Sequence, residues 1–314
     1  MKKMIKLFLV IIVIVIAICL VAILLLNLSR RMAVPNDYTA TVQTGGDIEA
    51  KYLAMGEYDV SYLEMGGLHD FKKYEIYYPS NIASMAKKLP VVIFSNGTGI
   101  PASKYPALLK HLASWGFIVM ATEEDHSWNG FSSEMCLRTI ISLNDTEAVE
   151  MWESNPFYQR VDLENIGVSG HSQGGVGVIN AVNENKHGAM IKTIFSASPT
   201  NMTLAQGLQW EYDPSLISVP VFFVSSTGDS DEKLVVSGQQ LQDIYDAVPN
   251  TVDKIMARRP NADHGDMLYY ADGYMTAWFM WQLQDDEYAS NAFIGKDAEI
   301  LSNKLYQDQN SNFQ

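Results

Sequence analysis

The chain has 314 residues, 47% of them hydrophobic, and a formal net charge of −14. This length is sufficient for one sizeable α/β domain with a buried core and too short for two large ones. Beyond residue 31 the sequence holds 17 basic against 36 acidic side chains, a balance that repels phosphate backbones, so nucleic acid is not an expected partner. With two cysteines (Cys19 and Cys136) and no metal-ligand, Walker or dinucleotide motif, we expect neither a disulfide framework nor a metal or other cofactor.

The N-terminus carries an unbroken apolar run over 7–26. As a helix rising about 1.5 Å per residue it would cover roughly 30 Å, the thickness of a bilayer core. The run exceeds the apolar region of about 7–15 residues found in signal peptides, and no small-x-small cleavage site follows it, so a cleaved signal peptide is the less favoured alternative. We predict a single-pass transmembrane anchor with basic flanks over 1–31. Three lysines before the run and two arginines after it favour an extracytoplasmic main domain.

The rest of the chain divides by composition into a linker, a domain and a tail. A polar, glycine-containing stretch over 32–57 is typical of a juxtamembrane linker, and a polar C-terminal tail is predicted over 295–314. Between them, over 58–294, short β-branched runs alternate with longer helical patterns. Strands are predicted at 59–65, 73–78, 91–94, 117–121, 166–169, 193–196 and 221–224. Helices are predicted at 104–115, around 134–152, and at 175–185, 233–247 and 267–283. Continuous apolar strands are typical of a parallel sheet covered on both faces, so the pattern predicts a mostly parallel, doubly wound α/β sheet flanked by helices.

The strongest local motif is Gly170-His171-Ser172-Gln173-Gly174-Gly175, between a predicted strand and a predicted helix. In that context a GxSxG turn forms a nucleophile elbow, because glycines let the chain turn sharply and project the serine oxygen above the sheet. The alternative is an ordinary glycine-rich strand-to-helix turn. We interpret Ser172 as a candidate nucleophile.

A serine hydroxyl needs a base to become a good nucleophile. In folds with such an elbow the partners follow in the order acid, then histidine, in loops at the carboxyl ends of strands. Asp229, with Asp231 as second choice, follows the predicted strand 221–224, and His264 precedes the last predicted helix. Singly, a turn-forming aspartate and a solvated histidine are the simpler interpretations. Together the residues predict a triad of Ser172, Asp229 and His264.

Four further residues are candidates around this triad. An oxyanion needs pre-aimed donors, and the backbone amides of Gln173 and of Thr98, in the glycine-rich loop 95–99, are predicted to supply them. For that loop an ordinary strand-to-helix connection is the alternative. His126 and Trp128 follow the predicted strand 117–121 and are candidate substrate-binding residues, although core or rim packing is the alternative for Trp128.

On these motifs the chain resembles the bacterial cutinase and polyester-hydrolase branch of the α/β hydrolases, over roughly 58–294. Similar patterns occur in dienelactone-hydrolase-like and platelet-activating-factor-acetylhydrolase-like proteins. The resemblance implies Ser172 as nucleophile and His264 as base. An ungapped alignment with the family pattern from Val219-Pro220 places the acid at Asp229. Thr98 and Gln173 depart from the pattern, since cutinases commonly have an aromatic residue and a methionine there, and the C-terminal disulfide of many cutinases is absent. The resembling segments are 91–99, 112–120, 161–175, 219–229, 277–286 and Phe293.

The sequence therefore predicts a membrane-anchored serine hydrolase that cleaves carboxylic esters, small-molecule or lipid, through an acyl-enzyme. Three alternatives stay open: acyl transfer to an acceptor other than water, as in an acyltransferase or perhydrolase; peptidase activity on the same triad; and a hydrolase-like scaffold that binds without chemistry. No oligomeric state is predicted.

Overall fold

The computed structural model describes residues 32–67, 71–147 and 155–313. The predicted anchor over 1–31 lies outside these residues. Within them, no helix combines the length and apolar character that crossing a bilayer requires.

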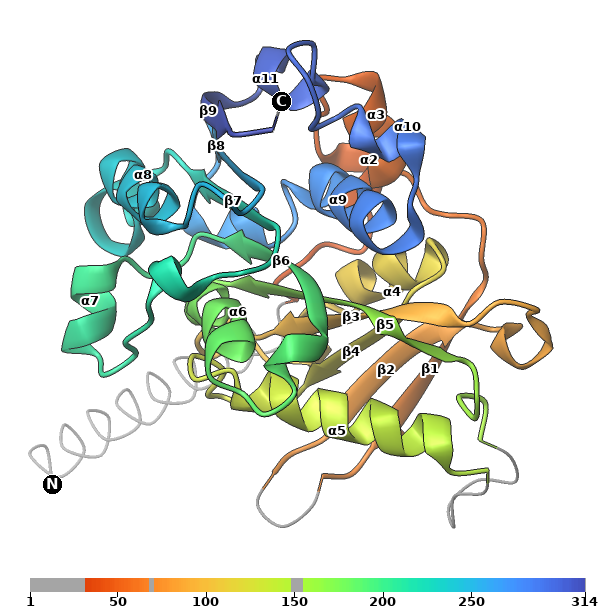
Figure 1. The fold of residues 1–314 in the computed structure, drawn as a ribbon. Helices are drawn as coiled ribbons and strands as arrows, with labels where there is room; N and C mark the ends of the chain where they lie inside the picture. The colour runs from red at the N-terminus through yellow and green to blue at the C-terminus, as the bar shows by residue number, and fades with distance from the viewer. Residues whose placement is uncertain (1–31, 68–70, 148–154, 314) are drawn as a thin grey trace, which may run out of the picture. The chain divides into compact units, whose positions relative to one another are not determined.

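A nine-stranded sheet runs through the domain in the order β1-β2-β4-β3-β5-β6-β7-β8-β9 (Figure 1). The six strands from β4 to β8 in this order are parallel to one another, and β1, β2 and β9 pair antiparallel at the two edges. This confirms the predicted mostly parallel α/β sheet. The strands are β1 (Val60–Met65), β2 (Tyr74–Pro79), β3 (Leu89–Ser95), β4 (Ile118–Thr122), β5 (Val161–His171), β6 (Ile191–Ala197), β7 (Val221–Ser226), β8 (Lys254–Arg259) and β9 (Gln307–Ser311).

Helices cover both faces of the sheet, with α4 and α9 on one face and α5 and α6 on the other (Figure 1). This is the doubly wound arrangement expected when parallel strands alternate with helices. Over the described residues the α-helices are α2 (Tyr38–Thr41), α3 (Asp47–Leu53), α4 (Pro106–Ser114), α5 (Phe131–Asp145), α6 (Gln173–Asn183), α7 (Met202–Gly207), α8 (Gly238–Ala247), α9 (Asp272–Gln284), α10 (Glu287–Ser290) and α11 (Glu299–Ser302).

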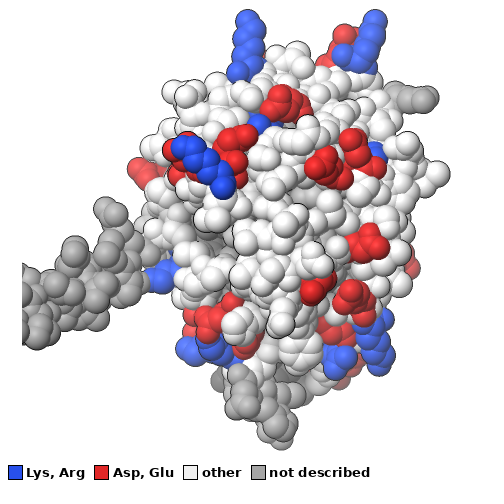
Figure 2. All heavy atoms as spheres, turned by 90° about the vertical axis from the view of Figure 1, so that its left-hand side faces the viewer, with Lys and Arg blue, Asp and Glu red and all other residues white. Residues whose placement is uncertain are grey.

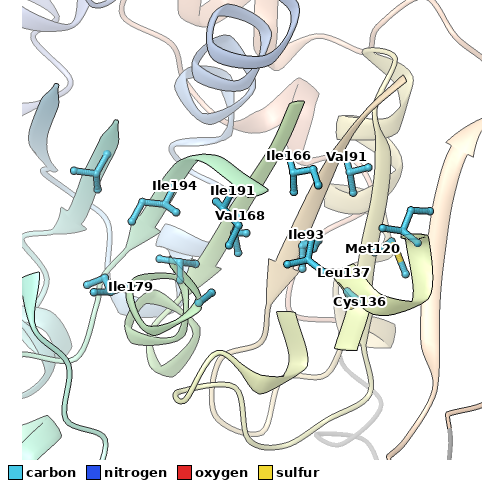
Figure 3. Close-up of a cluster of buried hydrophobic side chains, with 14 of the residues drawn as sticks. Val91, Ile93, Met120, Cys136, Leu137, Ile166, Val168, Ile179, Ile191 and Ile194 are labelled. Atoms are coloured by element: carbon cyan, nitrogen blue, oxygen red, sulfur yellow. The ribbon is translucent and has the colours of Figure 1, made fainter. Parts of the chain in front are cut away.

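The continuous apolar strands are buried on both faces because successive side chains point to opposite sides of a strand. Ile93 of β3 and Val168 of β5 pack with Leu137 of α5 and Ile179 of α6 in one cluster (Figure 3). The next residue of β3, Phe94, is also buried, and its ring packs on the opposite side against Tyr105, 5.1 Å away. Each such side chain stabilises the fold by roughly 1.5–3 kcal/mol. The core thus holds β3 and β5, whose carboxyl ends carry the candidate site.

The structure corrects the predicted linker over 32–57. Residues 34–314 form one compact unit, and helices α2 and α3 pack beside α9 within it (Figure 1). The Tyr38 hydroxyl donates to Asp272 Oδ2 at 2.6 Å, and Arg259 donates to buried Glu49 at 3.0 Å. Helices α2 and α3 contain few apolar residues, among them fully buried Tyr52. Segments this short do not show helical periodicity in the sequence.

The predicted tail over 295–314 is also part of the fold. Its residues form α11 and then β9, which pairs antiparallel with β8 and closes one edge of the sheet. The sequence of β9, Gln-Asp-Gln-Asn-Ser, is polar because an edge strand remains partly solvated.

Candidate active site

Ser172 lies at a sharp turn between β5 and α6. Its backbone has φ 60° and ψ −118°, a conformation that non-glycine residues rarely adopt. Such strain costs of order 1–3 kcal/mol and is found mostly at functional positions. The flanking glycines are required by space: a Cβ on Gly170 would lie 2.2 Å from the Gly174 carbonyl oxygen, and one on Gly174 would lie 2.1 Å from that of Ser95. The structure therefore has the strained strand-turn-helix geometry of a nucleophile elbow.

The imidazole of His264 joins Ser172 to a buried carboxylate. Its Nε2 lies 2.9 Å from Ser172 Oγ, and its Nδ1 lies 2.7 Å from Asp231 Oδ1. His264 opens the short 3₁₀ helix η6 (His264–Leu268), and Asp231 opens a single π-helical turn, η5 (Asp231–Val235). These segments follow β8 and β7, so all three side chains come from the carboxyl ends of parallel strands.

Asp229, the acid predicted from the sequence, does not reach His264. Its carboxylate is 80% exposed and binds the Lys233 ammonium at 2.6 Å. Strand β7 extends to Ser226, two residues beyond the predicted end, and the chain enters η5 only at Asp231. The structure thus corrects the acid position from Asp229 to Asp231, the second candidate.

The Asp231 carboxylate is fully buried and held by hydroxyl and amide donors. Its Oδ2 accepts from Ser198 Oγ at 2.7 Å, from Ser226 Oγ at 2.6 Å and from the Ser226 amide at 2.9 Å. Burial by itself raises the pKa of the Asp231 carboxyl, but the hydrogen bonds and charge of His264 and the two serine hydroxyls outweigh it and lower the pKa below its ordinary value. Asp231 is therefore an ionised acceptor for the imidazole. Sequence reasoning missed both serines, because a hydroxyl donor leaves no spacing pattern.

A second set of contacts joins the loop before Asp231 to the loop before His264. The Ser230 amide and hydroxyl donate to the two Asp263 carboxylate oxygens at 3.0 and 2.8 Å. The neighbouring Gly228 leaves room for this contact, since a Cβ there would lie 2.5 Å from Asp263 Oδ1. These bonds fix the residues next to Asp231 and His264 and thereby hold the two side chains in register.

His171, the residue before Ser172, contacts both the backbone and the ring of His264. Its Nε2 donates to the His264 carbonyl at 2.7 Å, and the two rings are 4.5 Å apart. Burial, together with the nearby His264, lowers the pKa of His171 to about 3. His171 is therefore neutral at neutral pH and places no positive charge beside His264.

The side chains of Gln173 and Thr98, whose backbone amides are the predicted oxyanion donors, are in contact. Gln173 is the first residue of α6, where a backbone amide has no acceptor within its own helix. Thr98 lies in the loop after β3, and Gln173 Nε2 donates to Thr98 Oγ1 at 3.1 Å. The structure thus brings the side chain of Thr98 to the start of α6, while the oxyanion role of the two backbone amides stays a prediction.

A cleft of about 490 Å³ opens beside these residues. The predicted His126 and Trp128 line it, as do Leu208 and Trp210, which follow α7 and were not predicted. Leu208 is 44% exposed, so apolar surface faces the solvent here. The parallel strands end on the left of Figure 1, and Figure 2 turns that side to the viewer: its middle is formed by uncharged residues, with Asp and Glu around them and Lys and Arg at the margins. Asp125 also lines the cleft, so the cleft is suited to a partly apolar ligand without negative charge.

Among the residues that the structure describes, no group of three or more His, Cys, Asp or Glu is arranged to hold a metal ion.

A family model described as PETase, PET hydrolase-like, matches residues 37–311, a range that includes every residue of the site described above. No curated protein matches the chain.

Proposed function

The chain belongs to the PET hydrolase-like family, and we propose that it hydrolyses carboxylic esters through an acyl-enzyme formed on Ser172. The observation that carries the proposal is the pair of hydrogen bonds that His264 makes, one with Ser172 Oγ and one with buried Asp231. The family match supports an ester hydrolase of the α/β-hydrolase type, and this hydrogen-bonded chain supports serine chemistry within it.

The proposed mechanism follows from the position of each proton. Ser172 Oγ attacks the ester carbonyl while His264 Nε2 takes the hydroxyl proton, which it then gives to the leaving alcohol. Asp231 accepts from Nδ1, which keeps Nε2 unprotonated in the resting state and stabilises the imidazolium. A water molecule, deprotonated by His264, then releases the acid and regenerates Ser172.

The tetrahedral intermediate places a negative charge on the former carbonyl oxygen. In the proposed site the backbone amides of Gln173 and Thr98 stabilise it, and such pre-aimed donors are each worth about 10²–10³-fold in rate. The acyl or alcohol group would lie in the cleft, where Trp128 and Trp210 offer aromatic surface. This lining supports an ester without negative charge, small-molecule or lipid, and the proposed chemistry uses no cofactor.

The proposal includes a membrane tether with the catalytic domain outside the cytoplasm. Its support is the apolar run over 7–26 with its basic flanks. Fractionation of cells expressing the full chain, with protease added to intact cells, tests this part separately from the chemistry.

The chemistry is tested by the hydrolysis of p-nitrophenyl esters of graded chain length. The wild type should release the free acid, and Ser172→Ala should lower kcat/KM by about 10⁴-fold or more, because the remaining site lacks a nucleophile. Ser302→Ala, an exposed serine on α11, is the matched control and should keep wild-type activity. Equal turnover by wild type and Ser172→Ala would contradict the proposal, and acyl groups recovered on an added acceptor alcohol in place of water would redirect it to acyl transfer.

A further inference from the structure

The side chain of Gln173 bridges two loops at the edge of the cleft. It is only 1% exposed. Its Oε1 accepts from the Ser127 backbone amide at 2.7 Å, and its Nε2 donates to Thr98 Oγ1 at 3.1 Å. One buried amide therefore holds both the loop after β3 and the loop after β4.

These two contacts fix which way the Gln173 amide faces. A backbone N–H can only donate, so the group opposite the Ser127 amide must be the oxygen of Gln173. The NH₂ group then faces Thr98, and because it has no acceptor capacity, the Thr98 hydroxyl must accept. The proton of that hydroxyl is consequently free to point to a third atom.

Thr98 is placed to present that proton to the reacting group. Its side chain is exposed and lines the cleft together with Gln173. The preceding residue, Gly97, lies against the nucleophile, since a Cβ built there would be 3.6 Å from Ser172 Cβ. The hydroxyl thus lies at the same edge of the cleft as the two proposed backbone donors.

We infer that the Thr98 hydroxyl donates a third hydrogen bond to the oxyanion, and that the Gln173 side chain is a positioning residue that sets the direction of this bond. The inference rests on the proposed ester hydrolysis. A hydroxyl whose lone pair is already engaged by a buried amide needs little reorganisation when charge develops, which is the condition for effective electrostatic stabilisation. Gln173 thereby acts twice, through its backbone amide on the oxyanion and through its side chain on Thr98.

The first test removes the hydroxyl and keeps the side-chain shape. Thr98→Val should lower kcat by about 10²-fold with little change in KM, because the bond forms only with the charged intermediate. Thr98→Ser, the matched control, keeps the hydroxyl and should stay within a few-fold of the wild type. Thr98→Ala should behave as Thr98→Val does, which separates loss of the donor from any effect of the valine methyl group. Wild-type kcat in Thr98→Val and Thr98→Ala would overturn the inference.

The second test asks whether Gln173 acts through Thr98. Gln173→Met keeps the backbone amide and approximate volume but removes the donor to Thr98 Oγ1. It should lower kcat in the wild type and have little further effect in the Thr98→Val background, since the hydroxyl that it orients is already gone. Active-site titration and thermal melting of each variant correct for loss of folded enzyme. The same factor in both backgrounds would overturn the positioning role.

The outcomes also separate this inference from the proposed function. If the folded wild type hydrolyses no ester, both the proposed function and the third oxyanion donor are contradicted. If hydrolysis depends on Ser172 but Thr98→Val and Thr98→Ala are as active as the wild type, only the third donor falls.

Discussion

The imidazole of His264 has a partner at each ring nitrogen, and each partner is fixed by a different device. Ser172 is held by a strained backbone with φ 60° between two glycines that admit no side chain. Asp231 is held by hydroxyl donors from β7 and from the end of β6. Because neither partner can move away easily, the ring is oriented before a substrate binds, which is the arrangement that catalysis by preorganisation requires.

We predict that the same substitution has a large effect on catalysis at Asp231 and a small one at Asp229. Asp231→Asn should lower kcat by about 10⁴-fold, because a neutral amide can donate to Nδ1, favours the wrong tautomer and does not stabilise the imidazolium. Asp229→Asn, two residues away, should stay within about twofold, since it removes only an exposed ion pair with Lys233. Ester hydrolysis rates measure both. A large loss with Asp229→Asn and none with Asp231→Asn would restore the acid predicted from the sequence.

The sequence predicted the type and the order of these residues more reliably than the position of the acid. Ser172 and His264 each stand in an unambiguous place, one in a GxSxG turn and the other as the sole histidine after β7. Two aspartates follow β7, however, and the choice between them depends on where the strand ends and where η5 begins. Strand ends are set by hydrogen bonding to neighbours, so composition alone does not locate them to within two residues.

At the scale of elements, His171 connects the end of β5 to the start of η6. Its Nε2 bond to the His264 carbonyl spans two segments that carry the nucleophile and the base. Burial lowers the pKa of His171 from 6.5 to about 3 in the folded protein. The unfolded chain therefore binds a proton between about pH 6.5 and pH 3 that the folded protein excludes, and the stability associated with His171 is present above this window and is lost as the pH falls through it.

The prediction is a difference between two pH profiles. His171→Gln keeps a donor near the Nε2 position but cannot titrate. Between pH 6 and pH 4, the free energy of unfolding of the wild type should fall more steeply than that of His171→Gln, by up to about 1.4 kcal/mol per pH unit. Denaturant unfolding at several pH values measures both curves, and the carboxyl groups common to the two proteins cancel in the difference. Parallel curves would show that folding does not lower the pKa of His171.

Elements with continuous apolar runs could be predicted from the sequence, and elements whose charges are paired could not. Strands β3 to β7 were predicted because their Val, Ile and Phe residues are buried on both faces. Strand β8 was missed because it carries Lys254, Arg258 and Arg259, all buried. The Lys254 ammonium donates to the carbonyls of Tyr245 and Val248, and Arg259 pairs with Glu49, more than 200 residues away. Such partners are visible only once the chain is folded.

At the scale of the whole domain, the buried polar contacts join the two ends of the folded unit. Glu49 of α3 accepts from Arg259 of β8 and from Tyr306, which lies just before β9. Asn303 also donates to Glu49, at 2.8 Å. The segments predicted as linker and tail therefore bind to each other and to the edge of the sheet, although each is polar when considered alone. Removing one charge from such a buried pair leaves the other uncompensated, so these segments belong to the stable core of the domain.

The distribution of charge over the surface bears on the proposed substrate. The chain is strongly acidic, yet the middle of the face in Figure 2 is formed by uncharged residues. The cleft beside Thr98 and Gln173 carries the indoles of Trp128 and Trp210. A neutral ester meets no charge repulsion there, whereas a polyanion would face a net charge of −14.

The proposed chemistry depends most on Ser172 being an activated nucleophile, and covalent labelling measures this directly. A fluorophosphonate probe added to the folded protein, followed by peptide mass mapping, should modify Ser172 alone and should lose most of its labelling rate in Asp231→Asn. Labelling of a different serine, or an unlabelled Ser172 in protein that melts cooperatively, would contradict the claim that His264 and Asp231 activate it.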